Sequence, residues 1–109
     1  MVTDRVLREH HRSVLADGRD FLLTYTLALS ESEKGPFCSI AVLLRERDRQ
    51  GNEREASCTV ELTYIRLDAA TLLFEKISGA FEPLFPAHLP DVVRDQLCPE
   101  ELLRVVQTE

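Results

Sequence analysis

Large apolar residues occupy every second position in two stretches of this chain, one from 20 to 30 and one from 56 to 64. They take the odd positions of the first stretch and the even positions of the second: Phe21, Leu23, Tyr25, Leu27 and Leu29, then Cys58, Val60, Leu62 and Tyr64. Because side chains alternate across a β-strand, each stretch predicts a strand with one apolar and one more polar face. Two such strands indicate an antiparallel sheet with one face covered by other elements.

The segment from 3 to 17 has two interpretations. As a helix capped at Thr3 and ended by Gly18, it would gather several side chains on one face: Val6, Leu7, His10, Val14 and Leu15. As the first arm of a hairpin turning at Asp17-Gly18, it would form three pairs with the next strand: Val14 with Phe21, His10 with Tyr25 and Val6 with Leu29. We favour the hairpin, because both valines then reach the apolar face. There His10 can hydrogen-bond the Tyr25 hydroxyl, while His11 points the other way.

A third strand is predicted from 37 to 45, and it is apolar on both faces. One face carries Cys38, Ile40, Val42 and Leu44, and the other carries Phe37, Ala41 and Leu43. A strand of this kind is typical of an enclosed, central position in a sheet. The residues from 45 to 55 are nearly all charged around Gly51-Asn52, which predicts a hairpin tip in solvent.

Beyond the fourth strand the apolar period changes from two to about 3.6 residues, which indicates helix. Asp68 can cap a first helix and Gly79 can end it, and its predicted stripe is Ala69, Leu72, Leu73 and Ile77, with Phe74 beside it. Pro83 and Pro86 exclude a regular helix from 80 to 86, which is predicted to be an extended apolar connector on the sheet or the first helix.

A second helix is predicted from about 87 to 97. Pro90 could not donate to the carbonyl of Pro86, so a start nearer 87–90 is favoured over one at Pro86. Its buried stripe is Leu89, Val92, Val93 and Leu97. A short third helix is predicted from 99 to 106.

These elements predict one α+β domain over residues 1–109, with about 1–3 and 98–109 fraying. The fold is a four-stranded antiparallel meander with two C-terminal helices packed on one face, a two-layer sandwich. Its predicted core is Phe21, Leu23, Tyr25, Leu27, Ile40, Val42, Val60, Leu62, Leu72, Leu73, Ile77, Leu89, Val92 and Val93.

Composition narrows the classes of function and location. Of 109 residues, 29% are charged and the net charge is -6, which disfavours nucleic acid and anionic membranes as partners. The longest apolar run, from 40 to 44, is far shorter than a membrane helix needs, and the N-terminus is too charged for a secretory signal. Three widely spaced cysteines do not form a disulfide framework. We expect a soluble, reduced, cytoplasmic protein.

The sharpest candidate for chemistry is the helical face that His88, Asp91 and Asp95 share. A histidine beside two carboxylates can bind a divalent metal or act as an acid–base pair. The favoured interpretation is structural, because a carboxylate in the first turn of a helix is stabilised by the helix dipole. Cys38 and Cys58 could face each other on neighbouring strands, but as apolar-face residues they are expected to pack in the core.

The second helix and the proline before it carry a resemblance to a known family. The residues are Pro86-x-His88-Leu89-x-Asp91-Val92-Val93-x-Asp95-x-Leu97. This pattern resembles the signature of a family of short clostridial (Firmicutes) proteins that share a domain of unknown function, and the resemblance extends back to about residue 4. The family usually has an aromatic-Gly-Ile unit in its third strand, where this chain has Phe37-Cys38-Ser39-Ile40. The resemblance implies the element order and an intracellular bacterial setting, and no enzyme activity.

Neither a phosphate-binding loop nor a nucleophile or metal motif occurs in the sequence, so no catalytic residue, metal or cofactor is expected. The leading hypothesis is a non-catalytic protein-interaction or regulatory module that binds a protein partner or self-associates. Its candidate surfaces are the edge strands and an exposed apolar patch of Phe81, Leu84 and Phe85. The alternative is a small-ligand or metal-binding protein, or an enzyme, with a site near His88 between sheet and helices.

Overall fold

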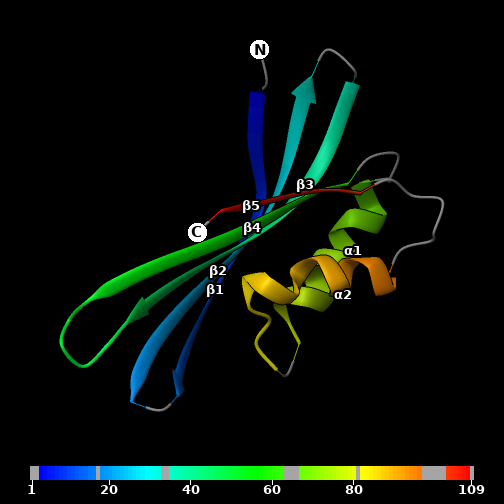
Figure 1. Cartoon of the computed structure of the whole chain (residues 1–109). Coiled ribbons are helices and arrows are strands. Elements are labelled where there is room, and N and C mark those ends of the chain that lie inside the picture. The colour runs from blue at the N-terminus through cyan, green and yellow to red at the C-terminus, as the bar shows by residue number, and fades with distance from the viewer. Residues whose placement is uncertain are drawn as a thin grey trace.

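The computed structural model describes residues 3–16, 18–32, 35–62, 67–80, 82–96 and 103–108. Its elements are β1 (Thr3–Ala16), β2 (Arg19–Ser32), β3 (Gly35–Arg47), β4 (Glu53–Leu62), α1 (Leu67–Ser78), the 3₁₀ turn η1 (Pro86–His88), α2 (Leu89–Gln96) and β5 (Leu103–Thr108). The strands form one antiparallel sheet in the order β1-β2-β3-β4-β5 (Figure 1). The α+β class and the meander of β1 to β4 are therefore confirmed, and β3 holds the predicted central position.

The first hairpin is a strand pair, as we favoured. Val14 lies opposite Phe21 and His10 opposite Tyr25, and Gly18 adopts a φ of 74°, which its lack of a Cβ permits. The predicted pairing of Val6 with Leu29 is wrong, because a β-bulge between Val6 and Arg8 shifts the register.

Because of the bulge, Leu7 and not Val6 is the side chain of β1 that reaches the core. Val6 now lies opposite Ala28 on the other face and is 57% exposed. Leu7 is partly buried against the core in its place. An inserted residue turns the preceding side chains to the opposite face, which explains the exchange.

The tip between β3 and β4 is held by one aspartate. The Asp48 carboxylate accepts hydrogen bonds from the amides of Gln50 and Asn52, both at 2.9 Å. Gly51 completes the turn with a φ of 85°. The hydrogen bonds to the Asn52 and Gln50 amides hold the pKa of the Asp48 carboxyl below its ordinary value.

The segment predicted to be a third helix, from 99 to 106, is instead strand β5 where the structure describes it, from 103 to 108, so the predicted helix is wrong there. Leu103 lies opposite Leu62, and Val105 lies opposite Val60. Two adjacent β-branched residues, Val105 and Val106, favour a strand. Pairing also supplies partners for backbone groups along the outer edge of β4, which outweighs the local helical pattern.

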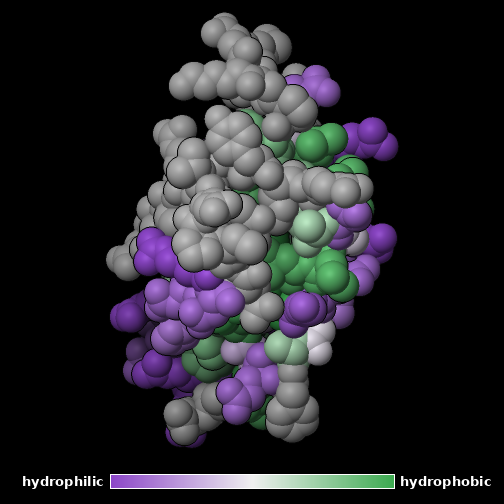
Figure 2. Space-filling model, turned by 90° about the vertical axis from the view of Figure 1, so that its right-hand side faces the viewer, coloured by the Kyte–Doolittle hydropathy of each residue, from purple (hydrophilic) through white to green (hydrophobic). Residues whose placement is uncertain are grey.

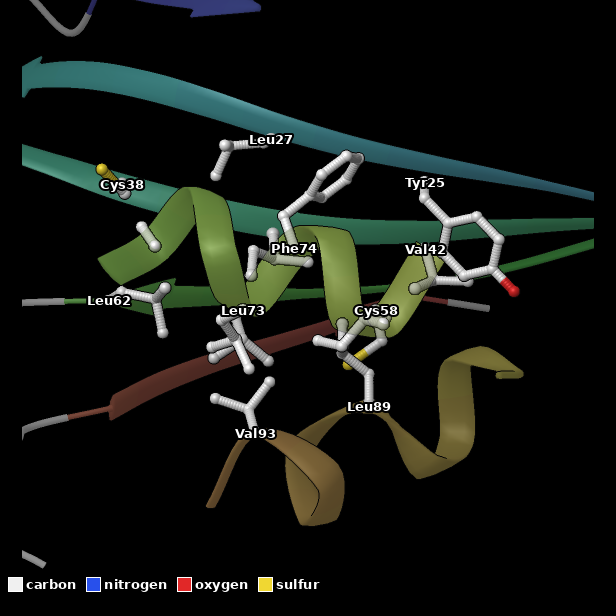
Figure 3. Packing of buried hydrophobic residues seen from close by; sticks show 14 of the residues in the cluster. Tyr25, Leu27, Cys38, Val42, Cys58, Leu62, Leu73, Phe74, Leu89 and Val93 are labelled. Carbon is white, nitrogen blue, oxygen red and sulfur yellow. The ribbon is translucent and has the colours of Figure 1, made fainter. Parts of the chain in front are cut away.

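Both helices lie on the same side of the sheet in Figure 1. Helix α1 contacts β2 and β3, and α2 contacts β4. Their buried side chains join those of the strands in one cluster: Leu23, Tyr25, Leu27, Cys38, Ile40, Val42, Cys58, Val60, Leu62, Ala70, Leu73, Phe74, Ile77, Leu89 and Val93. Figure 3 shows Leu89 and Val93 projecting from α2 toward Leu73 and Cys58.

Two members of the predicted helix stripe are wrong. Leu72 is 55% exposed, and Ala69 is exposed as well. The buried face of α1 is instead Ala70, Leu73, Phe74, Ile77 and Ser78. A helix rotated to bury Leu72 would also turn Glu75 and Lys76 inward, since they lie three and four residues further on. The observed rotation buries Phe74 instead.

The second helix begins within the predicted range of 87–90. Pro86 opens a 3₁₀ turn in which the Leu89 amide bonds to the Pro86 carbonyl, and α2 begins at Leu89. Because a 3₁₀ turn joins residues three apart, the Pro86 carbonyl accepts from Leu89 and does not need a donor at Pro90, which has no N–H. Pro90 then lies in the first turn of α2, where no intrahelical donor is needed.

Candidate functional site

The predicted polar surface of His88, Asp91 and Asp95 does not form a metal site. All three residues are exposed, His88 in η1 and the two aspartates in α2. Among the residues that the structure describes, no group of three His, Cys, Asp or Glu side chains is arranged to hold a metal ion. Asp91 lies in the first turn of α2, where the helix dipole favours a carboxylate.

A cavity of about 370 Å³ nevertheless opens beside His88. Three segments meet there: the last turns of α1, the connector that follows it, and η1 with the start of α2. Its apolar wall includes Ile77, Leu84 and Val92, and its polar groups are Lys76, Glu82 and His88. Asp91 and Asp95 do not line this cavity. The sequence therefore located the site through His88 and missed Lys76 and Glu82, which lie on different segments.

The connector is held against the sheet by its backbone. The Tyr25 hydroxyl donates to the carbonyl of Leu84 and accepts from its amide, at 3.0 and 3.1 Å. The Arg12 guanidinium donates to the carbonyl of Ala80. Burial raises the pKa of Tyr25, while the hydrogen bond to Leu84 and the charge of Arg12 oppose that rise. The predicted contact of the connector with the sheet is confirmed.

The expected hydrogen bond between His10 and the Tyr25 hydroxyl is wrong, because that hydroxyl bonds to Leu84. His10 lies opposite Tyr25 but stacks on its ring, with centroids 6.3 Å apart. It is exposed and not a core residue. The Tyr25 hydroxyl bonds to the connector instead, because Leu84 offers it a donor and an acceptor together.

The predicted interaction patch is largely engaged within the chain itself. Leu84 and Phe85 are partly buried against the core, and the Phe85 ring packs edge-on against Phe21, with centroids 5.8 Å apart. Phe81 lies outside the described residues. Leu84 and Phe85 therefore offer less free apolar surface than the sequence suggested. In Figure 2, which looks onto the side carrying the helices, hydrophobic residues form a patch bordered by hydrophilic ones.

The two described cysteines belong to the core. Cys38 lies opposite Leu62 and Cys58 opposite Val42, so the expectation that the thiols could face each other is wrong. Both are buried, and burial raises the pKa of each thiol. A thiol held neutral packs as a small apolar group, as expected.

The sheet surface turned away from α1 and α2, here called the outer face, has an uncharged centre. Strand register places these residues together on β2, β3 and β4: Thr24, Thr26, Ala28, Ser39, Ala41, Leu43, Ser57 and Thr59. All are partly exposed. Charged side chains stand at both ends: Arg45 meets Glu55 at 3.0 Å and Arg47 meets Glu53 at 2.6 Å at one end, and Glu61 lies opposite Ser39 at the other. The even positions of β2 held this signal, but from the sequence they were predicted only to form the more polar face of that strand.

A carboxylate, an imidazole and a hydroxyl line up on the β1 side of the outer face. Glu9 Oε1 lies 2.8 Å from His11 Nε2, and His11 Nδ1 lies 3.1 Å from Thr24 Oγ1. This order can pass a proton from a hydroxyl to an imidazole. The imidazole is 57% exposed, so water competes for these bonds. We interpret the three residues as a cross-strand polar contact between β1 and β2.

A larger depression of about 560 Å³ lies at the charged end of the sheet. Leu15 and Leu22 are among its lining residues and are 75% and 38% exposed. Both arginines in its lining already pair with glutamates, Arg45 with Glu55 and Arg47 with Glu53. A bound anion would have to displace these carboxylates, so the depression is a weaker ligand site than the cavity at His88.

No family model, curated protein or solved structure matches this chain. The resemblance to the clostridial family therefore stays a prediction. Among the described residues, no helix has the length and apolar character that crossing a membrane requires.

Proposed function

We propose that this protein is a non-catalytic interaction module that self-associates, with a second copy covering the outer face. The observation that carries the proposal is the uncharged centre of that face. In a chain with 29% charged residues, eight outward-facing positions of β2, β3 and β4 carry small, hydroxyl or apolar side chains, and Glu61 lies beyond them, opposite Ser39. Depletion of charge at the centre with polar groups at the rim is typical of protein interfaces.

The dimensions of the sheet support a stable contact. The molecule measures 46 × 30 × 20 Å, and a thickness near 20 Å fits a two-layer sandwich of a sheet and its helical cover. Five strands about 4.8 Å apart, each with about ten residues rising about 3.3 Å, present a face of about 800 Å². That area is about what each partner contributes to a standard protein interface.

Small side chains favour a sheet-on-sheet contact between two copies. Two sheets pack face to face at about 10 Å, and large side chains at the centre would hold them apart. Thr26 lies opposite Ala41, which in turn lies opposite Thr59. A second copy can approach this row closely, and threonine hydroxyls can bond across the contact.

Self-association through the β1 edge, the other surface that the sequence suggested, is less favourable. The bulge at Leu7 interrupts the regular spacing of backbone groups along β1. A symmetric antiparallel pair centred on His10 would also set Arg8 of each copy against Arg12 of the other. Like charges directly opposite destabilise a strand pair.

Light scattering coupled to size exclusion, over a concentration series, tests the proposal. We expect a dimer that Thr26→Arg and Ala41→Arg each dissociate, because each buries a charge at the centre of the contact. Both positions face outward, so both variants should keep the circular dichroism of the parent protein. The matched control is Leu72→Arg, which places the same charge on the exposed side of α1 and should leave the dimer intact.

Two results would overturn the proposal. One is a monomer for the parent protein at the highest concentration reached. The other is a dimer that survives Thr26→Arg and Ala41→Arg but is lost with Leu72→Arg, which would move the contact to α1.

The same proposal includes a cytoplasmic, bacterial setting in which proteins, not nucleic acids or membranes, are the partners. The net charge of -6 supports this choice of partners, because binding to phosphate groups requires an excess of basic residues. Binding to heparin or to anionic vesicles at low salt would contradict it.

A further inference from the structure

We infer that the cavity beside His88 binds a small molecule with an apolar body and one carboxylate. The cavity lies among the helices and the connector, whereas the proposed self-association uses the opposite side of the sheet. The two proposals are therefore independent, and the variants that test them do not overlap.

The apolar wall of the cavity is well fixed. Ile77 is 3% exposed and belongs to the core cluster. Leu84 is held at both its amide and its carbonyl by the buried Tyr25 hydroxyl. Val92 packs against the same core from α2. A wall tied to the core in three places does not have to be ordered when a ligand enters, which lowers the cost of binding.

The polar groups of the cavity favour a single negative charge. Lys76 and His88 both offer N–H donors, and Lys76 adds a positive charge. Glu82 lies in the same lining, so a ligand with two negative charges would meet repulsion there. Lys76 lies in the last turn of α1, a usual place for a lysine beside a helix dipole. Facing a cavity with an apolar wall, the same ammonium group is also available to a ligand.

The size of the cavity limits the ligand. A volume of about 370 Å³ is at the lower end of the range for small-molecule sites. It suits a body of about six to ten carbon atoms. For a ligand of that size we expect a Kd in the millimolar range.

Three probes that share a phenylpropyl body separate the apolar contribution from the charge: 3-phenylpropionate, 3-phenylpropan-1-ol and 3-phenylpropylamine. Each is titrated into the full chain labelled with ¹⁵N, and Kd is taken from amide chemical shifts. We expect the acid to bind about three- to fivefold more tightly than the alcohol, the usual size of a partly exposed charge pair. The amine should bind most weakly, and the shifts should map to 76–92.

The decisive variant is Lys76→Met, which keeps the length of the side chain and removes its charge. It should bring the Kd of the acid to that of the alcohol and leave the alcohol unchanged. Arg94→Met is the matched control, since it removes an exposed charge of α2 that does not line the cavity. Val92→Trp fills the cavity and should abolish binding of all three probes.

The inference is overturned if the acid and the alcohol bind equally, if the amine binds best, or if Lys76→Met leaves the acid unaffected. Shifts that map to Leu15 and Leu22 would also overturn it, because they would place the site in the depression at the charged end of the sheet. Lys76 is exposed, so a failure of Lys76→Met to fold is not expected to obscure the result.

Discussion

The Tyr25 hydroxyl and the backbone of Leu84 form two hydrogen bonds, one in each direction, at 3.0 and 3.1 Å. Tyr25 is fully buried in β2, and Leu84 lies in the connector between the helices. Tyr25 thus ties the connector to the sheet at Leu84, and Arg12 ties it at Ala80. In Figure 3 the Tyr25 ring lies at one end of the hydrophobic cluster, with its hydroxyl pointing out of it.

Tyr25→Phe tests this contact directly. The ring stays in place, but the amide and the carbonyl of Leu84 lose a shared partner in a partly buried position. We expect the free energy of unfolding in urea to fall by about 1–3 kcal/mol. Ser13→Ala, which removes an exposed hydroxyl from β1, is the control and should change it by less than about 0.5 kcal/mol. A loss equally small in both variants would contradict the assignment.

The pH dependence of stability follows from three buried groups. Burial raises the pKa of Tyr25 above 10.0 and those of Cys38 and Cys58 above 9.0. As pH rises, the unfolded chain loses these protons first, so the folded state binds more protons and its stability falls. We expect constant stability up to about pH 9 and a decline above it, measured as the thermal midpoint from pH 7 to 11. Tyr25→Phe should make the decline shallower above pH 10, and a flat profile to pH 11 would refute the expectation.

Alanine substitutions at Leu62 and Leu72 distinguish the packing in the structure from the packing predicted from the sequence. The sequence placed both in the core, whereas Leu62 is 1% and Leu72 is 55% exposed. We expect Leu62→Ala to lower the free energy of unfolding by about 2–5 kcal/mol through the cavity it leaves. Leu72→Ala should lower it by less than about 1 kcal/mol, because little packing is removed. Equal losses would show that α1 is rotated differently.

Gly51 provides a test of the β3–β4 turn. Its φ is 85°, and a Cβ built there meets no atom within 4 Å. Any cost of Gly51→Ala therefore comes from the backbone, and we expect about 1–2 kcal/mol in urea unfolding. Gly51→Asn should cost clearly less, since asparagine tolerates this conformation. An alanine variant as stable as the parent would show that the turn takes another form in solution.

The sheet was predictable because several independent features of the sequence indicate the same strand register. Alternation in β2 and β4 and the Asp17-Gly18 turn agree on the register, and one residue of slip would expose the whole apolar set. The bulge at Leu7 was not predictable, because Val6 and Leu7 are both apolar and either can serve the core. Strand β5 was missed since its partner lies beyond two helices along the chain.

The candidate site was only partly predictable for a related reason. His88 stood out as a rare residue type, whereas Lys76 and Glu82 look like ordinary surface charges until α1 and the connector bring them to one cavity. The rotation of α1 about its axis depends on whether Leu72 or Phe74 packs against the sheet. That choice is made by packing against β2 and β3, and not by the periodicity of the helix.

The bulge at Leu7 has a consequence for how copies of this chain can assemble. A long, regular outer strand can template the addition of further chains, each presenting a fresh edge in turn, as in cross-β fibrils. The bulge at Leu7 interrupts the regular spacing of backbone hydrogen-bonding groups along β1, which such growth would require at that edge. We therefore expect association to stop at a closed pair, and concentrated protein to remain free of thioflavin-positive aggregates.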